Sequence, residues 1–195
     1  MSIFKRKHDF RPDKERANAL SKLYITKKQR LTIAKWLLMA LVLVFVSVLQ
    51  DVVMSRVSLF GATTDLVPVA LLTACIMLDP ESGSVFVLVA SALYYFSGTA
   101  PGPHVILLIT LLGILVAIVR QNYLRYGFFA VALCAAGAMM LYELTIYALG
   151  FFLGQTTGSR FMAFVTTGLL SLAAIPILYP IFTAIGKIGG ETWKE

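Results

Sequence analysis

The chain has 195 residues, of which 58% are hydrophobic and only 14% charged, and its mean hydropathy is +0.82. A water-soluble domain of this size could not hide so much apolar surface, so the composition excludes that class and predicts a polytopic membrane protein. The net charge is +7. No nucleic-acid-binding module accompanies this charge, so we expect no nucleic-acid partner.

Long apolar runs follow one another along the chain, at residues 31–49, 60–78, 83–97, 104–119, 127–153 and 161–185. A helix needs about 20 apolar residues to cross the hydrocarbon, and lipid offers no partner to an open backbone. The sequence therefore predicts an all-α bundle of six spans. The third and fourth runs are short and would need a thinner bilayer or an extra helical turn. The second and third runs could instead form a re-entrant hairpin.

Basic residues are distributed asymmetrically between the segments that connect these runs. Ten Lys or Arg residues lie within residues 1–30. With six spans and a cytoplasmic N-terminus, most other connecting basic residues are also cytoplasmic, namely Arg120, Arg125, Lys187 and Lys194, whereas two lie outside, Arg56 and Arg160. This distribution follows the positive-inside rule, so we expect both termini in the cytoplasm.

The chain divides into a basic tail at 1–30, a membrane domain at 31–186 and a short second tail at 187–195. The first tail has apolar residues at helical spacing, and basic residues expected at the membrane surface surround them: Lys22, Lys27, Lys28 and Arg30. This pattern is typical of an interfacial helix whose basic face meets anionic lipid. A solvated tail that fixes orientation, or a docking segment for a cytoplasmic partner, fits the same residues.

No catalytic signature accompanies the apolar runs. The sequence lacks the HExxH and GxSxG patterns and a Gly-rich phosphate loop, and its two histidines are His8 and His104. Cys75 and Cys134 lie inside apolar runs, and neither their number nor their spacing indicates a metal site. We therefore expect a protein that is not an enzyme and that has no metal or cofactor.

Glu143 places a carboxyl group inside the fifth apolar run. Met140 and Tyr147 lie on the same helical face, and the Tyr147 hydroxyl could donate to the carboxyl; Tyr94 and Tyr95 are alternative donors. An ionisable residue in a membrane helix usually faces inward and is paired. Glu143 is therefore a hydrogen-bonded structural group, a contact for a partner's helix, or a ligand-binding group.

Polar and turn-forming residues border the runs at two expected outer connections. Asp65 follows Thr63 and Thr64 at the start of a helix, where these side chains offer N-cap oxygens, and it is a second candidate for a structural or partner contact. Tight turns are expected at Gly61, Gly98, Pro101 and Gly102.

Several short motifs stand in a characteristic order along the chain. They are SVLQ at 47–50, LFGATTDLVPVALL at 59–72, Gly83 at the start of the third run, FSGTAPG at 96–102 and LLGILVAIVRQNYLRYG at 111–127. This order resembles the MreD family of bacterial rod shape-determining proteins, over roughly residues 37–155. Departures from the family pattern are Thr64 in place of proline, Val87 and Ser91 in place of glycines, and Tyr95 in place of aspartate.

The resemblance implies a non-enzymatic component of the cell-elongation machinery in the bacterial cytoplasmic membrane. Its implied partner is an MreC-like bitopic protein, together with an MreB-like cytoskeletal protein, a SEDS glycosyltransferase and a class B penicillin-binding protein. On this interpretation Glu143 holds the bundle together or marks the face where a partner's single helix docks.

The family bundle is similar to the substrate-binding subunits of ECF-type vitamin transporters, which supply the alternative function. Those subunits commonly dock through an A-x-x-x-A pattern on the first helix, but here Leu38 follows Ala34 at that spacing and Val44 follows Ala40. Asn and Gln are also nearly absent from the runs, although a vitamin pocket needs several convergent polar groups. We therefore favour the cell-shape scaffold.

Overall fold

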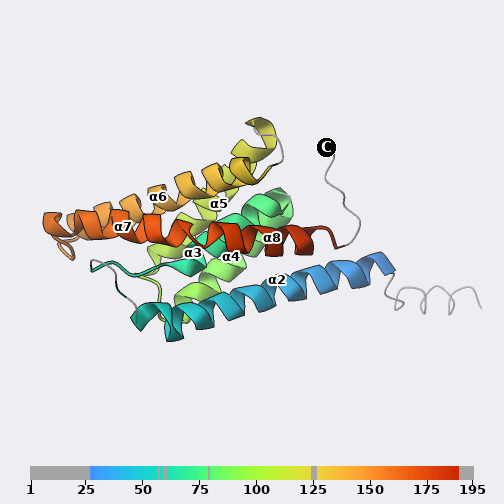
Figure 1. Ribbon diagram of the computed structural model, residues 1–195, viewed down its shortest axis with the longest axis horizontal. Helices are drawn as coiled ribbons and strands as arrows, with labels where there is room; N and C mark the ends of the chain where they lie inside the picture. The colour runs from blue at the N-terminus through green and yellow to red at the C-terminus, as the bar shows by residue number, and fades with distance from the viewer. Residues whose placement is uncertain (1–26, 57, 59–60, 79, 124–126, 189–195) are drawn as a thin grey trace, which may run out of the picture.

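The chain folds into helices, several of which run along the long axis of the molecule (Figure 1). The computed structural model describes residues 27–56, 58, 61–78, 80–123 and 127–188. Across these residues no strand occurs, so the prediction of an all-α protein is confirmed. The elements in chain order are α2 (Lys27–Val52), η1 (Met54–Arg56), α3 (Leu66–Met77), α4 (Pro80–Phe96), α5 (His104–Tyr123), α6 (Phe128–Phe152), η2 (Gly158–Arg160), α7 (Phe161–Leu172) and α8 (Ile175–Gly186).

Three of the described helices are long and apolar enough to cross a membrane: α2 from Gln29 onward, α5 and α6. A fourth span results if α7 and α8, which meet at a bend of 46°, are counted as one broken helix. The chain thus has the apolar helices of a membrane protein.

Three helices differ in length or continuity from the apolar runs that predicted them. The run 60–78 gives only the 12-residue α3, which is about 18 Å long and too short to span the hydrocarbon unaided. The run 104–119, expected to be short, forms the 20-residue α5. The run 161–185 breaks before Pro176, because proline lacks the N–H that would continue the helix from α7.

The short helix α3 lies inside the bundle. All 12 of its residues are buried, and it packs against α2, α4, α5, α6, α7 and α8. In Figure 1 it lies in the middle of the molecule, behind α7 and α8. A helix that is apolar on every side is stable only where neighbours surround it, and this explains the absence of a polar stripe in its sequence.

Both ends of α3 are bonded by long side chains from neighbouring helices. At its start, the Val67 N–H donates to Oε1 of Gln50, at the end of α2, over 2.8 Å. At its other end, Nη1 of the buried Arg120, from the last turn of α5, donates to the Ile76 carbonyl. The terminal N–H and C=O groups of a helix lack partners within it, so these bonds allow both ends to be buried.

Two glycines let α4 and α5 approach α3 closely. A Cβ atom on Gly83 would lie 3.2 Å from both the carbonyl oxygen and Sγ of Cys75, and one on Gly113 would lie 3.3 Å from the same sulfur. Cys75 and Cys134 are both buried free thiols. The glycines that open α4 and occupy the middle of α5 therefore act in helix packing.

The N-terminal tail lies mostly outside the described residues, which begin at Lys27. The interfacial helix predicted there, with Lys22, is among the parts that the structure leaves undescribed, as are residues 189–195 of the second tail. Lys27, Lys28 and Arg30 belong to the first turn of α2.

Candidate functional site: a polar cavity

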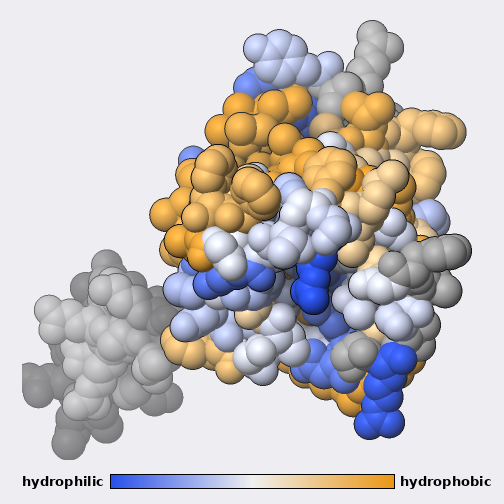
Figure 2. Space-filling model, turned by 90° about the vertical axis from the view of Figure 1, so that its left-hand side faces the viewer, coloured by the Kyte–Doolittle hydropathy of each residue, from blue (hydrophilic) through white to orange (hydrophobic). Residues whose placement is uncertain are grey.

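A polar cavity of about 710 Å³ lies at the end of the bundle where α2 ends and α3 begins. Three connections border it, through residues 61 and 63–65, through Thr99 and Pro101, and through Ser159 and Arg160. The rest of the wall consists of Gln50 of α2, residues of α7, and Tyr142, Glu143 and Ile146 of α6. Figure 2 faces this end and shows hydrophilic residues gathered across its middle, below a hydrophobic flank.

Glu143 reaches the cavity from the interior of α6. It stands nine residues before Phe152, the last residue of that helix, which is about 14 Å at 1.5 Å per residue. The residue is only 4% exposed, and its Oε1 atom has no hydrogen-bond partner among the described residues. The cavity wall thus contains a deep carboxyl group with one buried oxygen, Oε1, that accepts no hydrogen bond from the described part of the chain.

The tyrosines expected to donate to Glu143 make other contacts. The Tyr147 ring packs edge-on against Phe161 and Phe164, with ring centroids 5.2 and 5.5 Å apart. Tyr94 donates its hydroxyl to Asp65 over 3.1 Å. Among the described residues, neither tyrosine supplies the hydrogen bond that the sequence predicted for the Glu143 carboxyl.

Helix α7 instead approaches α6 closely at Met140 and Glu143. A Cβ atom on Gly168 would lie 2.9 Å from Sδ of Met140 and 3.4 Å from Cγ of Glu143. The glycine therefore brings the α7 backbone against the methylene groups of Glu143. This contact fixes the base of the side chain while its Oε1 atom keeps no partner among the described residues.

Asp65 is the centre of a hydrogen-bonded cluster that joins four helices. Its Oδ1 atom accepts from Nε2 of Gln50 over 2.8 Å and from the Tyr94 hydroxyl, and its N–H donates to Oγ of Ser171 over 2.7 Å. These contacts connect the start of α3 with α2, α4 and α7. Burial raises the pKa of Asp65 to about 6, and the bonds from Gln50 and Tyr94 oppose that rise.

The N-cap role predicted for Asp65 is only partly correct. The residue does occupy the N-cap position of α3, but its side chain makes no capping hydrogen bond. Gln50 accepts from the Val67 N–H instead. A glutamine on another helix could take over this role because α2 ends directly beside the start of α3 (Figure 1).

Two of the four predicted turn residues, Gly61 and Pro101, line the cavity. Gly61 and Gly98 have φ values of +76° and +82°, in the left-handed region that residues with a Cβ rarely adopt. A Cβ atom on Gly102 would lie 2.7 Å from the His104 ring. Gly61 and Pro101 both contribute to the cavity wall, so these turns shape the rim as well as reversing the chain.

The basic cluster at the start of α2 is remote from the cavity. Arg30 precedes Gln50 by 20 residues on a single helix, which corresponds to about 30 Å. Arg160 is the basic residue that lines the cavity, and its side chain is exposed at the rim. The surface role predicted for Lys27, Lys28 and Arg30 is therefore separate from the cavity.

Sequence reasoning did not foresee the roles of Gln50 and Ser171. Both are buried polar residues at the ends of apolar segments, and a Gln directly after a long apolar run is the signal that could have been used for Gln50. Nothing in the local sequence distinguishes Ser171 from an ordinary helical serine.

The chemistry available to the cavity is hydrogen bonding and charge pairing. The described residues contain no group of three or more His, Cys, Asp or Glu side chains that could hold a metal ion. Hydroxyl groups of the wall at Thr64 and Tyr142 are buried without a hydrogen-bond partner among those residues. No family model, curated protein or solved structure matches the chain.

Proposed function

We propose that this chain is a non-enzymatic integral membrane component of the bacterial cell-elongation complex, binding an MreC-like protein and wall synthases to maintain cell shape. The proposal rests on the resemblance of residues 37–155 to the MreD family. Its structural support is a lateral apolar groove that offers a place for the single helix of a bitopic partner.

The proposed topology has six crossings and two cytoplasmic termini, in a bundle similar to the ECF substrate-binding subunits. In this arrangement α3 and α4 are the short second and third crossings, and α7 with α8 forms the bent sixth. The polar cavity then faces the outer side, and Arg120 lies towards the cytoplasmic side.

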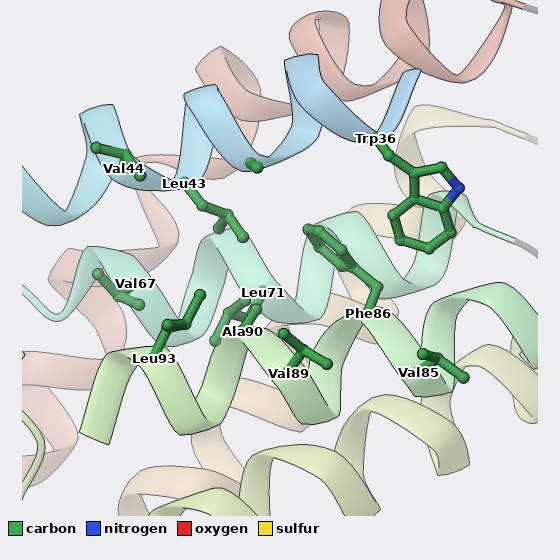
Figure 3. Close-up of a pocket in the computed structure, with 11 residues that line it drawn as sticks. Trp36, Leu43, Val44, Val67, Leu71, Val85, Phe86, Val89, Ala90 and Leu93 are labelled. Atoms are coloured by element: carbon green, nitrogen blue, oxygen red, sulfur yellow. The ribbon is translucent and has the colours of Figure 1, made fainter. Parts of the chain in front are cut away.

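The groove lies between α2 and α4, with α3 as its floor, and has a volume of about 420 Å³ (Figure 3). Trp36 of α2 and Phe86 of α4 meet across one end, with ring centroids 5.5 Å apart. On the α4 wall, Val85 and Leu93 are 62% and 65% exposed. The groove thus presents apolar side chains over about 12 Å of helix, more than two turns.

An apolar transmembrane helix suits this groove better than a polar ligand does. Its lining residues are apolar throughout, from Trp36 to Leu93. Helices associate in lipid mainly through close packing and through small residues at the contact. Ala40, an exposed small residue on the α2 wall, would allow such an approach.

The groove contact can be tested with the variant Ala40→Trp, which fills the groove from its α2 wall. The matched control is Ala184→Trp, at an exposed alanine of α8 outside the groove. After co-expression with the MreC-like protein, we expect mild-detergent pull-downs to recover that partner with wild type and Ala184→Trp but not with Ala40→Trp. Equal recovery with both variants would exclude this groove as the docking site.

The function itself can be tested by a pull-down of the tagged wild-type chain from its native membranes, with bound proteins identified by mass spectrometry. We expect an MreC-like protein, with the SEDS glycosyltransferase, the class B penicillin-binding protein and an MreB-like protein at lower yield. Recovery of a membrane coupling subunit with its ATPases would refute the scaffold proposal.

The alternative function, an ECF-type substrate-binding subunit, is favoured by one observation. The polar cavity of about 710 Å³ lies within the size range of small-molecule sites and has convergent polar groups. Few amide side chains lie in the apolar runs, and for this reason the sequence did not predict such a pocket. The cavity obtains its polar groups mainly from the connections between helices and from Glu143.

A further inference from the structure

The deep wall of the polar cavity carries a carboxyl group for which the described residues supply no complement. Glu143 is 4% exposed, lines the cavity and leaves Oε1 without a hydrogen-bond partner. A carboxylate there would lack a countercharge, and a carboxylic acid would still leave a buried oxygen unpaired. Either state is costly inside an apolar bundle unless something in the cavity completes the bonding.

Neighbouring charged groups do not supply the missing partner of the Glu143 carboxyl. Arg160 lies at the exposed rim, whereas Glu143 stands about 14 Å from the end of α6. Arg160 donates no hydrogen bond to Glu143 Oε1, which has no partner among the described residues. Asp65, the other carboxyl in the wall, adds negative charge, although its Oδ1 atom already accepts two hydrogen bonds.

We infer that the polar cavity binds a small organic molecule carrying an ammonium group, with that group donating to Glu143 at the deep end. An ammonium supplies both the positive charge and the N–H donors that Oε1 lacks. Hydroxyl oxygens at Thr64 and Tyr142, also unpartnered in the described residues, provide further acceptors for the same ligand. Anionic ligands are disfavoured because both carboxyl groups would face them.

The size of the cavity suits such a ligand. Its volume of about 710 Å³ falls within the ~300–1,000 Å³ that small-molecule sites occupy. Met162, Ala163 and Phe164 of α7 line the same space, so apolar carbon of the ligand would pack there while its ammonium reached Glu143. The inference holds whether the chain acts in a scaffold, where the ligand would be regulatory, or in a transporter.

The test uses the purified full-length chain in lipid nanodiscs, titrated with ethanolamine, agmatine and spermidine while thermal unfolding is followed. Ethylene glycol is the uncharged counterpart of ethanolamine. The variant is Glu143→Gln, which keeps size and hydrogen bonding but removes the charge, and the control is Glu81→Gln, at an exposed carboxyl outside the cavity. Extracts of the same preparations are analysed by mass spectrometry for amines that co-purify.

We expect at least one amine to raise the unfolding temperature saturably, or to co-purify, with wild type and Glu81→Gln, and ethylene glycol to have no effect. Glu143→Gln should weaken binding by about tenfold or more, because the amide still accepts a hydrogen bond but no longer supplies the negative charge that pairs with the ammonium. Glu143→Asp, which keeps the charge on a shorter arm, should retain part of the binding. If no amine binds or co-purifies, or if binding is the same in Glu143→Gln, the cavity holds only water and the inference is wrong.

Discussion

Replacing Gln50 by leucine should disconnect the start of α3 from α2. Gln50 is 9% exposed; its Nε2 atom donates to Asp65 over 2.8 Å, and its Oε1 atom accepts from the Val67 N–H over 2.8 Å. Leucine has a similar volume but can do neither. The Val67 N–H would then be buried without an acceptor, and Asp65 would keep the Tyr94 hydroxyl as its remaining side-chain donor.

The expected loss of unfolding free energy is about 2–4 kcal/mol. Leaving a buried donor unsatisfied costs about 1–3 kcal/mol, and a hydrogen bond to a carboxylate contributes about 1.5–3 kcal/mol. We take a value below the sum of the upper limits because polar contacts between membrane helices average only about 0.6 kcal/mol in measured cycles. The loss should appear in the unfolding free energy rather than in the helix content of the native state.

The assay is reversible unfolding by SDS in mixed micelles, followed by tryptophan fluorescence, for wild type, Gln50→Leu and Gln155→Leu. Gln155 is exposed in the connection after α6, so the same substitution there should change stability by less than about 0.5 kcal/mol. Tyr94→Phe should cost about 1 kcal/mol and should be non-additive with Gln50→Leu, because both residues donate to the same oxygen. A Gln50→Leu protein as stable as Gln155→Leu would refute the argument that this cluster holds α3.

Three further changes test separate features of the fold. Burial raises the pKa of Asp65 from 3.8 to about 6, so between these pH values the folded state binds a proton that the unfolded state releases. The free energy of unfolding should therefore fall as the pH rises from about 4 to 6. Asp65→Asn should flatten this fall in unfolding curves measured across that range. Gly168→Leu would force a side chain against Met140 Sδ, 2.9 Å from the Cβ position, and should lower the unfolding free energy in SDS by about 1–3 kcal/mol. Gly137→Leu, where a Cβ would have no atom within 4 Å, should lower it by less than about 0.5 kcal/mol. Equal losses would argue against the close α6–α7 contact. Arg120→Met removes the donor to the carbonyl at the end of α3 and should lower stability by about 1–3 kcal/mol, with Arg120→Lys recovering part of the loss in the same measurement.

The helices of the chain could be predicted because their signal is local. The apolar run 127–153 gave α6 almost to the residue, and Gly98 marked the end of α4. Length was less predictable, since α3 starts only at Leu66. The first turn of α3 is bonded by Gln50, which the linear sequence separates from Val67 by 17 residues.

The candidate site could be predicted in part. The sequence identified Glu143 and Asp65 as unusual carboxyl groups, but it could not show that both border one cavity. Tyr94, one of the alternative donors considered for Glu143, donates to Asp65 instead. The choice of partner depends on which helices pack side by side, because several hydroxyl groups are chemically equivalent donors.

By itself, the sequence determined that the protein is helical and apolar enough for a membrane, because hydrophobicity and the need to satisfy the backbone act residue by residue along the chain. Only the tertiary structure decided that α3 is an internal helix bonded at both ends, and that Glu143 faces a cavity without a partner among the described residues. These features depend on groups far apart in sequence, such as the Asp65 N–H and Ser171, which are separated by 106 residues. Hydrogen bonds act only over about 3 Å, so the packing of the helices determines which of these groups meet.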